Sequence, residues 1–402
     1  MKVSIIGLGY VGLPTALLAA KSGFEVSGID IDSEKIDQLN NNKFTFDEFA
    51  LNEIFQNPEI MKNIRFQSKS DSADIFVIAV PTPIQEDKTS DLSYVLSAIE
   101  DIAKVLKPGN TLIIESTCPV NIADHVIAKI QNLLPKLFND LNQPLFHLSY
   151  CPERVLPGNT VSEIINNPRA IGGYTNESAI QAKCFYSAFV KGDISITNIK
   201  TAACSKLIEN AFRDVNIAFA NELMKFSFEL GIDHEELINL ANQHPRVNIL
   251  QSGIGVGGHC IPVDPWFLIE ADKKNTSLVR RARTINDNQP EYIINIINMS
   301  LNSNTSSNRL LVLGISYKAN SSDHRDSPAI KVILGLKKLS HVSEILVFDP
   351  HITSNEELKK FDIELLSEMP SNLDAYNQII KLVNHQEFIE DQRVAKSITI
   401  SF

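Results

Sequence analysis

Short apolar runs alternate with amphipathic stretches over the first half of the chain. The run VSII, just after the N-terminus, is followed by apolar residues at helical spacing through about Lys21 and by a second run from Glu25 to Ile29. Two further runs, within ADIFVIAVPTP ending at Val80 and within NTLIIESTCP ending near Glu115, break into Thr, Ser and Pro at their carboxyl ends. Runs of this kind are typical of buried strands, so the pattern predicts an open α/β sheet.

The second half of the chain begins with a different pattern. From about Thr201 to Gly231, apolar residues recur at helical spacing without an interrupting Gly or Pro, which predicts one long helix. The last hundred residues return to strand, glycine, loop, helix and strand, with Gly314 after the first strand and Asp349 after the second. We therefore expect an α/β protein with two Rossmann-like doubly wound domains, joined by a long central helix and a small helical dimerisation domain.

Composition narrows the possible partners and location. The 402 residues carry a formal net charge of −11, and Lys and Arg are scattered without a basic run, which argues against a nucleic-acid partner. The 5 cysteines are an odd number without a CxxC pair, which argues against a disulfide framework and a zinc site. The apolar run Val3–Ile6 is too short for a signal peptide, and no stretch is long enough for a membrane span. We expect a cytoplasmic protein.

The turn Gly7-Leu8-Gly9-Tyr10-Val11-Gly12 follows the first predicted strand and opens the first predicted helix. Gly7 suits a tight turn, Gly9 lets the backbone approach a pyrophosphate, and Gly12 lets helix and strand pack closely. Asp30 ends the second strand, where a carboxylate accepts hydrogen bonds from a ribose hydroxyl and repels a 2′-phosphate. The pattern predicts an NAD site; the alternative is a glycine turn that only packs.

Hydroxyl side chains at the ends of the third and fourth predicted strands are candidates for the same site. Thr82, Ser116 and Thr117 stand where open α/β sheets bind ligands, so we expect them to line the cofactor cleft. The alternative is that each hydroxyl caps the following helix.

The stretch GVGGHCIPVDPW, Gly255 to Trp266, places Cys260 directly after a glycine-rich bend and before Asp264. A thiol held there could face a cleft, or it could pack inside a buried turn. Lys206 and Asn210 are four residues apart on the long helix and share one face, which is either a cleft wall or a solvated surface. Lys318 and Arg325, in the C-terminal loop, suit a diphosphate or are surface cations.

Taken together, the motifs resemble those of the UDP-glucose/GDP-mannose dehydrogenase family, four-electron NAD enzymes that oxidise UDP-sugars at C6. The resemblance runs from Met1 to about Asp349, more loosely beyond, and rests on GLGYVGLP, VPTP, ESTCPV, CPERVLPGN, SKLIENAFRDVNIAFANE, GVGGHCIPVDPWF and SYKANSSDHRDS, all in the family's order. HPRVNILQ and the His before Cys260 are most similar to the UDP-N-acetyl-mannosamine branch.

The resemblance implies a role for each matching residue. Cys260 would be the nucleophile that holds the sugar as a thiohemiacetal and then a thioester. Lys206 and Asn210 would stabilise the oxyanion, Asp264 would position water, and Glu153 would assist thioester hydrolysis. The implied cofactor-binding residues are Gly7, Gly9, Tyr10, Val11, Gly12, Asp30, Thr82, Thr117 and Arg325, with Thr117 also in the catalytic group. The implied substrate-binding residues are Glu153, Arg154, Val155, Lys206, Asn210, Arg246, Gly257, His259 and Lys318.

The same resemblance implies the organisation of the chain. Residues 1–198 would bind NAD, residues 199–304 would form the central helical and dimerisation domain with the catalytic cysteine, and residues 305–402 would bind the UDP-sugar. No metal is expected. Arg246 matches an arginine that reaches the sugar across a subunit interface, which implies a homodimer.

The expected reaction is oxidation of UDP-N-acetyl-D-mannosamine to its uronate for polysaccharide precursor synthesis. Pro157 stands where UDP-glucose enzymes carry a second glutamate, which argues against glucose. Ser252 and Ile254 replace a Pro-Gly-Pro-Gly run usual in the branch, and the KSITISF ending departs from the family. UDP-N-acetyl-D-glucosamine and UDP-glucose remain alternatives. A two-electron hydroxyacid dehydrogenase and a non-catalytic nucleotide-sugar binding protein are the rival classes.

Overall fold

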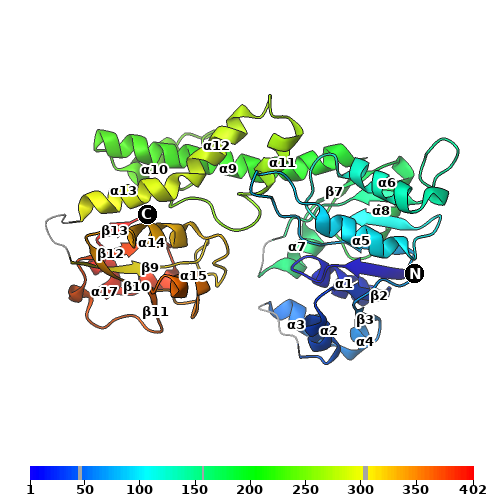
Figure 1. Cartoon of the computed structure of the whole chain (residues 1–402), viewed down its shortest axis with the longest axis horizontal. Coiled ribbons are helices and arrows are strands. Elements are labelled where there is room, and N and C mark those ends of the chain that lie inside the picture. Colours follow the sequence, from blue (N-terminus) through cyan, green and yellow to red (C-terminus); the bar gives the residue numbers. More distant parts are fainter. Residues whose placement is uncertain (44–47, 156–157, 302–306) are drawn as a thin grey trace. The chain divides into compact units, whose positions relative to one another are not determined.

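The computed structural model describes residues 1–43, 48–155, 158–301 and 307–402 (Figure 1). They form two compact units, an N-terminal unit of Met1–Glu209 with Trp266–Lys273 and a C-terminal unit of Asn210–Pro265 with Lys274–Phe402. Each unit contains one sheet with helices packed on it, and the long helix α9 runs from one unit into the other. This confirms the predicted fold class. The predicted domain boundaries stay a prediction, and Pro157 lies outside the described residues.

The N-terminal unit is built on an eight-stranded sheet of order β3-β2-β1-β4-β5-β6-β7-β8. All neighbouring strands pair in parallel except β6 and β7, which are antiparallel. The strands are β1 (Lys2–Ile6), β2 (Glu25–Ile29), β3 (Ile64–Gln67), β4 (Ile75–Ile78), β5 (Thr111–Ile114), β6 (His147–Tyr150), β7 (Arg169–Gly173) and β8 (Ile194–Asn198). The strand order reverses between β1 and β4, where doubly wound sheets bind their ligands.

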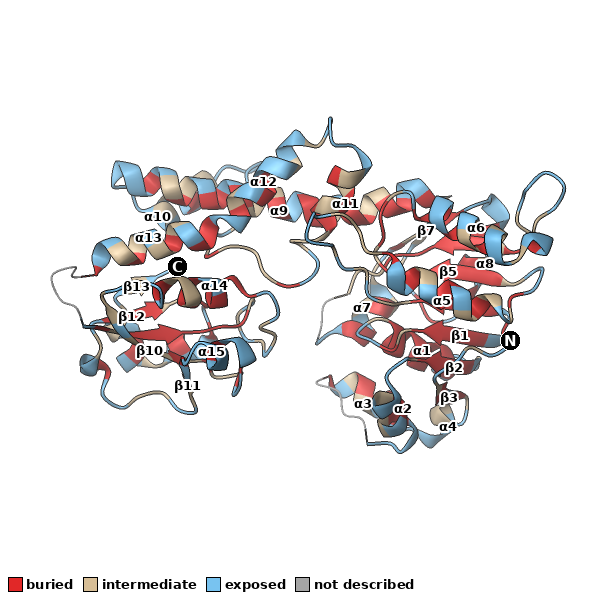
Figure 2. Ribbon diagram, in the orientation of Figure 1, coloured by how far each residue is buried: buried red, intermediate tan, exposed pale blue. Residues whose placement is uncertain are grey.

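Both faces of this sheet are buried, as Figure 2 shows. Along β4, Ile75 and Val77 pack into one apolar cluster, while Phe76 and Ile78 pack into another. The covering helices are α1 (Gly12–Lys21), α2 (Ser33–Asn40), α3 (Phe49–Phe55), α4 (Pro58–Met61), α5 (Ser93–Ala103), α6 (Ile122–Leu133), α7 (Thr160–Asn166) and α8 (Asn176–Tyr186). The apolar runs are continuous rather than alternating because both sets of side chains are buried. The strand predicted to end at Val80 ends at Ile78 instead.

The predicted long helix is present as α9 (Ile199–Leu230). It is followed by α10 (His234–Ala241), α11 (Asp264–Ala271), α12 (Ser277–Asp287) and α13 (Gln289–Ser300). Gly231, which ends α9, has a φ of 65°, a left-handed conformation that favours glycine at the end of a helix. In the described ranges, no helix combines the length and apolar character needed to cross a bilayer.

The C-terminal sheet has five parallel strands in the order β11-β10-β9-β12-β13. The strands are β9 (Asn308–Leu313), β10 (Val342–Phe348), β11 (Glu364–Leu366), β12 (Gln378–Lys381) and β13 (Ile400–Ser401). The helices are α14 (Pro328–Leu336), α15 (Glu356–Lys360), α16 (Gln386–Glu390) and α17 (Gln392–Ser397). Along β9, Leu310 and Val312 face one apolar cluster and Leu311 and Leu313 face another. This sheet therefore repeats the two-faced burial of the first.

Candidate active site

The glycine turn after β1 has the shape of a phosphate-binding cradle. Gly7 has a φ of 91°, and a Cβ built on Gly12 would lie 1.9 Å from the Gly7 carbonyl oxygen, so both positions require glycine. A Cβ on Gly9 would meet no heavy atom of the described residues within 4 Å, which leaves its backbone open to a ligand. Val11 precedes α1 and no side chain caps the helix, so no side-chain acceptor competes with a phosphate at this helix end. Tyr10 lies exposed on the same turn.

Asp30 lies at the end of β2, next to this turn. Its Oδ2 accepts hydrogen bonds from Leu8 N at 3.0 Å and Lys35 Nζ at 2.9 Å, and its Oδ1 accepts from Asp32 N at 3.0 Å. Burial by itself raises the pKa of Asp30, but these hydrogen bonds outweigh it and the pKa is lowered from its usual value. The carboxylate is therefore ionised at neutral pH, as an acceptor for a ribose hydroxyl must be.

The hydroxyl residues predicted at the ends of β4 and β5 link the segments that follow these two strands. Thr82 Oγ1 donates to the Thr117 carbonyl oxygen, and Ser116 Oγ donates to the Val80 carbonyl oxygen at 2.7 Å. Ser116 is buried, and its hydroxyl is used within the protein. Thr82 and Thr117 are partly exposed, which suits side chains beside a cofactor.

Glu153 and Lys206 come together within the N-terminal unit. Lys206, buried on α9, places its Nζ 3.5 Å from Glu153 Oε1, while Glu153 Oε2 accepts a hydrogen bond from Val155 N at 2.6 Å. Arg154, predicted to bind substrate, pairs with Glu209 at 2.5 Å and donates to the Pro168 carbonyl at 3.0 Å in this structure. The ammonium of Lys206 and the carboxylate of Glu153 therefore lie next to each other.

The residues around Cys260 lie in the C-terminal unit. Cys260 is exposed, and its Sγ lies 3.3 Å from His259 Nδ1. The Cys260 carbonyl oxygen accepts a hydrogen bond from Asp264 N at 2.9 Å, and Asp264 is the first residue of α11. The buried Asp264 carboxylate in turn accepts from Asn210 Nδ2 at 2.6 Å. The thiol thus contacts the imidazole, and the backbone after it leads to a carboxylate that is bonded to an amide.

The glycine bend before Cys260 packs against the loop at residues 314–327, hereafter the 314–327 loop. A Cβ on Gly257 would lie 2.7 Å from Tyr317 Cβ, and one on Gly258 would lie 3.1 Å from the Tyr317 ring. Gly258 N donates to the Arg325 carbonyl at 3.3 Å. The two glycines therefore permit close contact between chain segments, in addition to any approach of a ligand.

The two predicted cations of the 314–327 loop are both exposed, but their surroundings differ. Arg325 makes two hydrogen bonds to the Asp323 carboxylate, from Nε at 2.9 Å and from Nη2 at 2.5 Å. Burial raises the pKa of Asp323, but the bonds to Arg325 outweigh it and lower the pKa. Lys318, held through its carbonyl by Ser316 Oγ at 2.7 Å, extends outward from the loop.

Arg246 was predicted as a site residue, whereas Tyr317 and His385 were not. Arg246 is exposed in the segment after α10, where its backbone N–H bonds to His244 Nδ1 at 3.3 Å. Tyr317, which contacts the glycine bend, and His385, which lies beneath the 314–327 loop, were not predicted from the sequence. The position of Tyr317 beside Lys318 was the only sequence signal for it.

Comparison with known proteins places the chain in a class. Models of the UDP-glucose/GDP-mannose dehydrogenase family match its NAD binding domain at residues 1–190, its central domain at 200–288 and its UDP binding domain at 311–400. A UDP-N-acetyl-D-mannosamine dehydrogenase of Methanococcus vannielii is 40% identical over 392 residues, covering 96% of this chain and 87% of that protein. An NDP-N-acetyl-D-galactosaminuronic acid dehydrogenase of Ralstonia solanacearum is 39% identical over 407 residues, covering 99% and 94%.

A solved structure agrees with these matches. The UDP-D-ManNAc dehydrogenase of Pyrococcus horikoshii superposes with a TM-score of 0.87 at 34% identity, covering 100% of this chain and 94% of that one. The fold and the site define an NAD-dependent UDP-sugar 6-dehydrogenase. The chain belongs to the UDP-glucose/GDP-mannose dehydrogenase family. The predicted family and cofactor are confirmed.

Proposed function

We propose that this enzyme oxidises the C6 hydroxymethyl group of UDP-N-acetyl-D-mannosamine to the carboxylate, with two NAD molecules reduced per sugar. The observation that carries the proposal is the exposed Cys260 thiol beside His259, four residues before Asp264, whose carboxylate accepts a hydrogen bond from Asn210. An alcohol dehydrogenase that stops at the aldehyde needs no nucleophile. A thiol next to a base is the arrangement that holds an aldehyde for a second oxidation.

The steps balance in atoms and electrons. The sugar alcohol loses one hydride to NAD and one proton, which leaves an aldehyde. The Cys260 sulfur then bonds to the aldehyde carbon, giving a thiohemiacetal whose carbon still carries one hydrogen. Loss of that hydrogen as a second hydride, with the hydroxyl proton, gives a thioester. Water attacks this carbonyl, releases the carboxylate and returns the thiol.

The chain's own residues have distinct roles in this proposal. The ring of His259, at 3.3 Å, accepts the thiol proton as sulfur attacks. Asn210 and Lys206 stabilise negative charge on the substrate oxygen, as an amide and a cation can. Asp264 orients water, and Glu153 with Thr117 assists hydrolysis. The open turn at Gly9 and the ionised Asp30 hold NAD, which accepts hydride when bound.

The UDP part of the substrate is assigned to the C-terminal unit. Lys318 is exposed there in the loop that follows the carboxyl end of β9, the end at which doubly wound sheets bind ligands. Gly257, Arg154 and Val155 remain proposed contacts of the substrate, and Arg325 remains a proposed contact of the cofactor. In this structure Arg154 pairs with Glu209 and Arg325 with Asp323.

The test is a substrate panel with counted turnover. UDP-N-acetyl-D-mannosamine, UDP-N-acetyl-D-glucosamine, UDP-N-acetyl-D-galactosamine and UDP-glucose are each incubated with NAD, and reduced cofactor is counted per uronate formed. We expect two per molecule with the mannosamine sugar and slower oxidation of the others. One per molecule would support a two-electron dehydrogenase and overturn the proposal. The similarity to the galactosaminuronate enzyme makes the galactosamine sugar the second candidate.

The thiol is tested by Cys260→Ser with Cys184→Ser as the matched control. Both cysteines are exposed, but Cys184 lies on α8, in the other unit. We expect Cys260→Ser to lower uronate formation by about a thousandfold or more, and Cys184→Ser to leave it unchanged. Full activity of Cys260→Ser would also favour a non-covalent mechanism and reject the thioester.

We further propose that the enzyme is a homodimer that uses α9. Phe212, Phe219, Phe226 and Leu230 share one face of this helix, the first three about two turns apart and the last about one turn on, and they are 66%, 50%, 54% and 57% exposed. Such an apolar stripe is typical of a helix that packs on a partner. Light scattering of wild type and Phe219→Lys tests this; a dimer that Phe219→Lys converts to a monomer is expected. Arg246 is then the proposed contact to the partner's sugar.

A further inference from the structure

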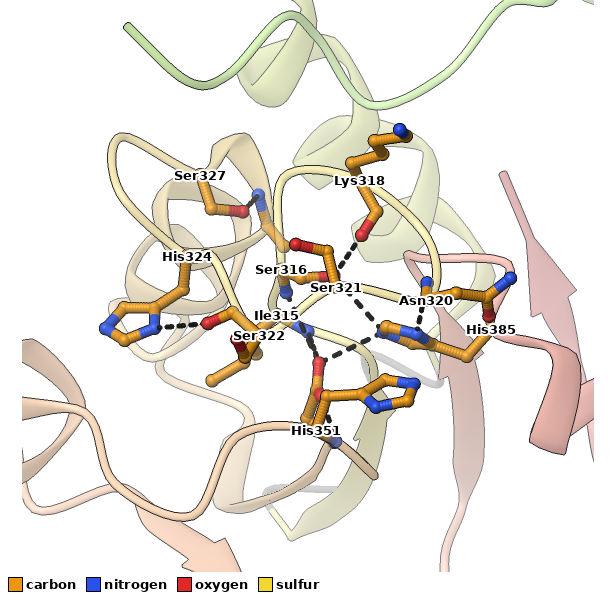
Figure 3. A network of polar contacts seen from close by, with 12 residues as sticks. Ile315, Ser316, Lys318, Asn320, Ser321, Ser322, His324, Ser327, His351 and His385 are labelled. Atoms are coloured by element: carbon orange, nitrogen blue, oxygen red, sulfur yellow. Dashed lines mark hydrogen bonds and ion pairs between the residues drawn. The ribbon is translucent and has the colours of Figure 1, made fainter. Parts of the chain in front are cut away.

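A buried imidazole lies beneath the 314–327 loop. His385 directly precedes α16, is fully buried, and reaches three places at once (Figure 3). Its Nδ1 accepts a hydrogen bond from Asn320 N at 3.0 Å, and its Nε2 lies 3.2 Å from both Asp349 Oδ2 and Ser316 Oγ. None of the reaction steps uses this residue, yet every polar atom of its ring faces the loop or the strand end that supports it.

The hydrogen bonds define which ring nitrogen carries the proton. Asn320 N–H can only donate, so Nδ1 of His385 presents a lone pair to it. In the neutral ring the proton is then on Nε2, which faces the ionised Asp349 carboxylate, an acceptor. Both nitrogens are therefore engaged in complementary bonds.

This assignment also rules out the metal site that the neighbouring side chains suggest. Ligand atoms of His351, His385 and Glu387 lie within 4.8 Å of one another. A metal requires a ring lone pair, and the only one on His385 is directed at Asn320 N–H. The remaining pair, His351 and Glu387, is too few ligands for a structural ion. We therefore explain the burial of His385 by its hydrogen bonds to Asn320 and Asp349.

The Asp349 carboxylate extends the network to the start of the loop. Its Oδ2 accepts from Ile315 N at 2.7 Å and from Ser316 N at 3.3 Å, and its Oδ1 accepts from His351 N at 2.9 Å. The imidazole and carboxylate thus bind the first residues of the loop and, through Asn320, its middle. A second hydrogen bond connects the same two segments, because Asn320 Oδ1 accepts from the N–H of Gln386, the residue after His385, at 2.9 Å.

The held loop carries residues that bear on the reaction. Ser316 Oγ, beside His385, donates to the Lys318 carbonyl at 2.7 Å, so the backbone that presents Lys318 is set by this contact. Tyr317 packs on Gly257 and Gly258, which lie three and two residues before Cys260. A displaced loop would therefore move the Lys318 cation and remove the support of the thiol's glycine bend.

We propose that His385 is a positioning residue, which together with Asp349 holds the 314–327 loop in the shape that binds the diphosphate of the UDP-sugar. The proposal rests on the assignment of Lys318 to the UDP portion. Its physical basis is preorganisation: a loop held before the ligand arrives loses less conformational entropy on binding. His385 itself touches no substrate atom and acts through the backbone of the loop.

The test compares His385→Leu, which removes both bonds, with His385→Asn, which keeps an acceptor near Nδ1, and Ser316→Ala, which removes one hydroxyl. Glu387→Gln is the matched control, since Glu387 is exposed on the same short helix and contacts His351 rather than the loop. The first readout is hydrogen exchange of the peptide around residues 315–322 in the ligand-free protein. We expect about tenfold faster exchange in His385→Leu, a smaller increase in His385→Asn, and none in the control.

The second readout is ligand affinity, measured by calorimetry with UDP and with NAD. We expect the Kd of UDP and the KM of the UDP-sugar to rise about tenfold in His385→Leu, with NAD affinity unchanged and kcat changed less than KM. Wild-type UDP affinity and exchange in a folded His385→Leu would overturn the inference. If His385→Leu does not fold, unchanged exchange in both His385→Asn and Ser316→Ala would overturn it.

The two proposals fail in different ways. A wild-type protein that does not bind UDP would overturn the assignment of Lys318 and the proposed function. The exchange measurement needs no ligand, so it would still show whether His385 holds the loop. Conversely, a protein that binds UDP equally well with and without the His385 bonds would retain its function and refute the positioning role.

Discussion

The two sheets of this enzyme share a glycine after the first strand and an aspartate after the second, but the surroundings of these residues differ. In each, a strand ends at a glycine with a left-handed φ, 91° at Gly7 and 87° at Gly314, and the next strand ends at an aspartate. Each aspartate accepts the N–H of the residue after the glycine, at 3.0 Å for Asp30 and Leu8 and at 2.7 Å for Asp349 and Ile315. The same scaffold therefore supports two nucleotide sites.

The two units differ in the segment that comes after the glycine. In the first sheet, α1 begins at Gly12 after apolar Val11, and no side chain caps this end of the helix. The Leu13 N–H donates to the Gly9 carbonyl oxygen at 3.2 Å and Pro14 has no N–H, so a phosphate there would bind the backbone of the glycine turn. In the second, α14 begins later, and the N–H of Ala329 is already taken by Ser327 Oγ at 3.2 Å. The proposed phosphate ligand there is a side chain, Lys318. We therefore expect the first unit to bind phosphate mainly through backbone groups and the second mainly through side chains of the 314–327 loop.

The aspartates differ for the same reason. The side chain of Asp30 is 11% exposed and pairs with Lys35, whereas that of Asp349 is fully buried against His385. A carboxylate sealed in this way cannot reach a ribose. The comparison teaches that an aspartate after the second strand identifies the scaffold, while its exposure decides whether it binds ligand.

The largest effect is expected at Gly12. Gly12→Ala places a Cβ 1.9 Å from the Gly7 carbonyl, so the turn must move, and we expect a loss of about 3 kcal/mol of stability and of about a hundredfold in NAD affinity. Gly9→Ala is the control: it meets no described atom within 4 Å, so stability should stay within about 0.5 kcal/mol while NAD affinity still falls. Denaturant unfolding and NAD titration measure both. Equal stability losses would contradict the close packing at Gly12.

The second effect separates the two aspartates. We expect Asp349→Asn to lower the free energy of unfolding by about 2–3 kcal/mol, because buried donors lose an ionised acceptor, and Asp30→Asn by about 1 kcal/mol. NAD affinity should fall only in Asp30→Asn. A stability loss in Asp30→Asn as large as in Asp349→Asn would refute the distinction.

The buried aspartate also predicts a pH dependence. Burial raises the pKa of Asp349, but hydrogen bonds from His385 and from the N–H groups of Ile315 and His351 outweigh it, so the folded pKa is lowered. Its stabilisation is therefore complete above the unfolded pKa of about 3.9 and is lost as pH falls through the folded pKa. Wild type should lose stability between about pH 4 and pH 2 more steeply than Asp349→Asn. Parallel acid unfolding curves would contradict this.

A third, smaller effect tests the side-chain binding of the second unit. Lys318→Ala should raise the KM for the UDP-sugar about tenfold, since it removes one charged contact, and leave the KM for NAD unchanged. Lys331→Ala, an exposed lysine on α14, is the matched control. Initial rates with each substrate varied decide the outcome, and a change in the NAD constant alone would reverse the assignment.

The smallest effect is expected for the Lys35–Asp30 ion pair of the first unit, in which Lys35 is the partner of the aspartate as His385 is in the second unit. The Lys35 ammonium is 2.9 Å from Asp30, but both side chains have some solvent access. Lys35→Ala should cost only about 0.5 kcal/mol, as for partly exposed pairs, and NAD should still bind. Urea unfolding at low and high salt measures it. A loss above about 2 kcal/mol would show that this aspartate, too, depends on a buried partner.

The sequence predicted the elements well because their signals are local. Periodicity identified the long helix α9 and strands β1, β2, β4, β5, β9 and β10, and the glycine spacing identified the NAD turn. Strands β3, β7 and β8 were not predicted. The strand predicted to end at Val80 was two residues too long, since apolar character continues past the last paired residue Ile78. The engagement of Arg154 by Glu209, 55 residues away, left no mark in the spacing of either.

What the sequence by itself determined was the class of each segment and the chemistry available in it: glycines at a phosphate turn, and a cysteine beside a histidine. Tertiary structure alone decided which groups meet. Asn210 reaches Asp264, Tyr317 covers Gly258, and His385 seals Asp349 across 36 residues. The physical reason is range: periodicity and turn chemistry act between neighbours in the chain, whereas burial and hydrogen bonding between distant residues depend on how the sheets and loops pack.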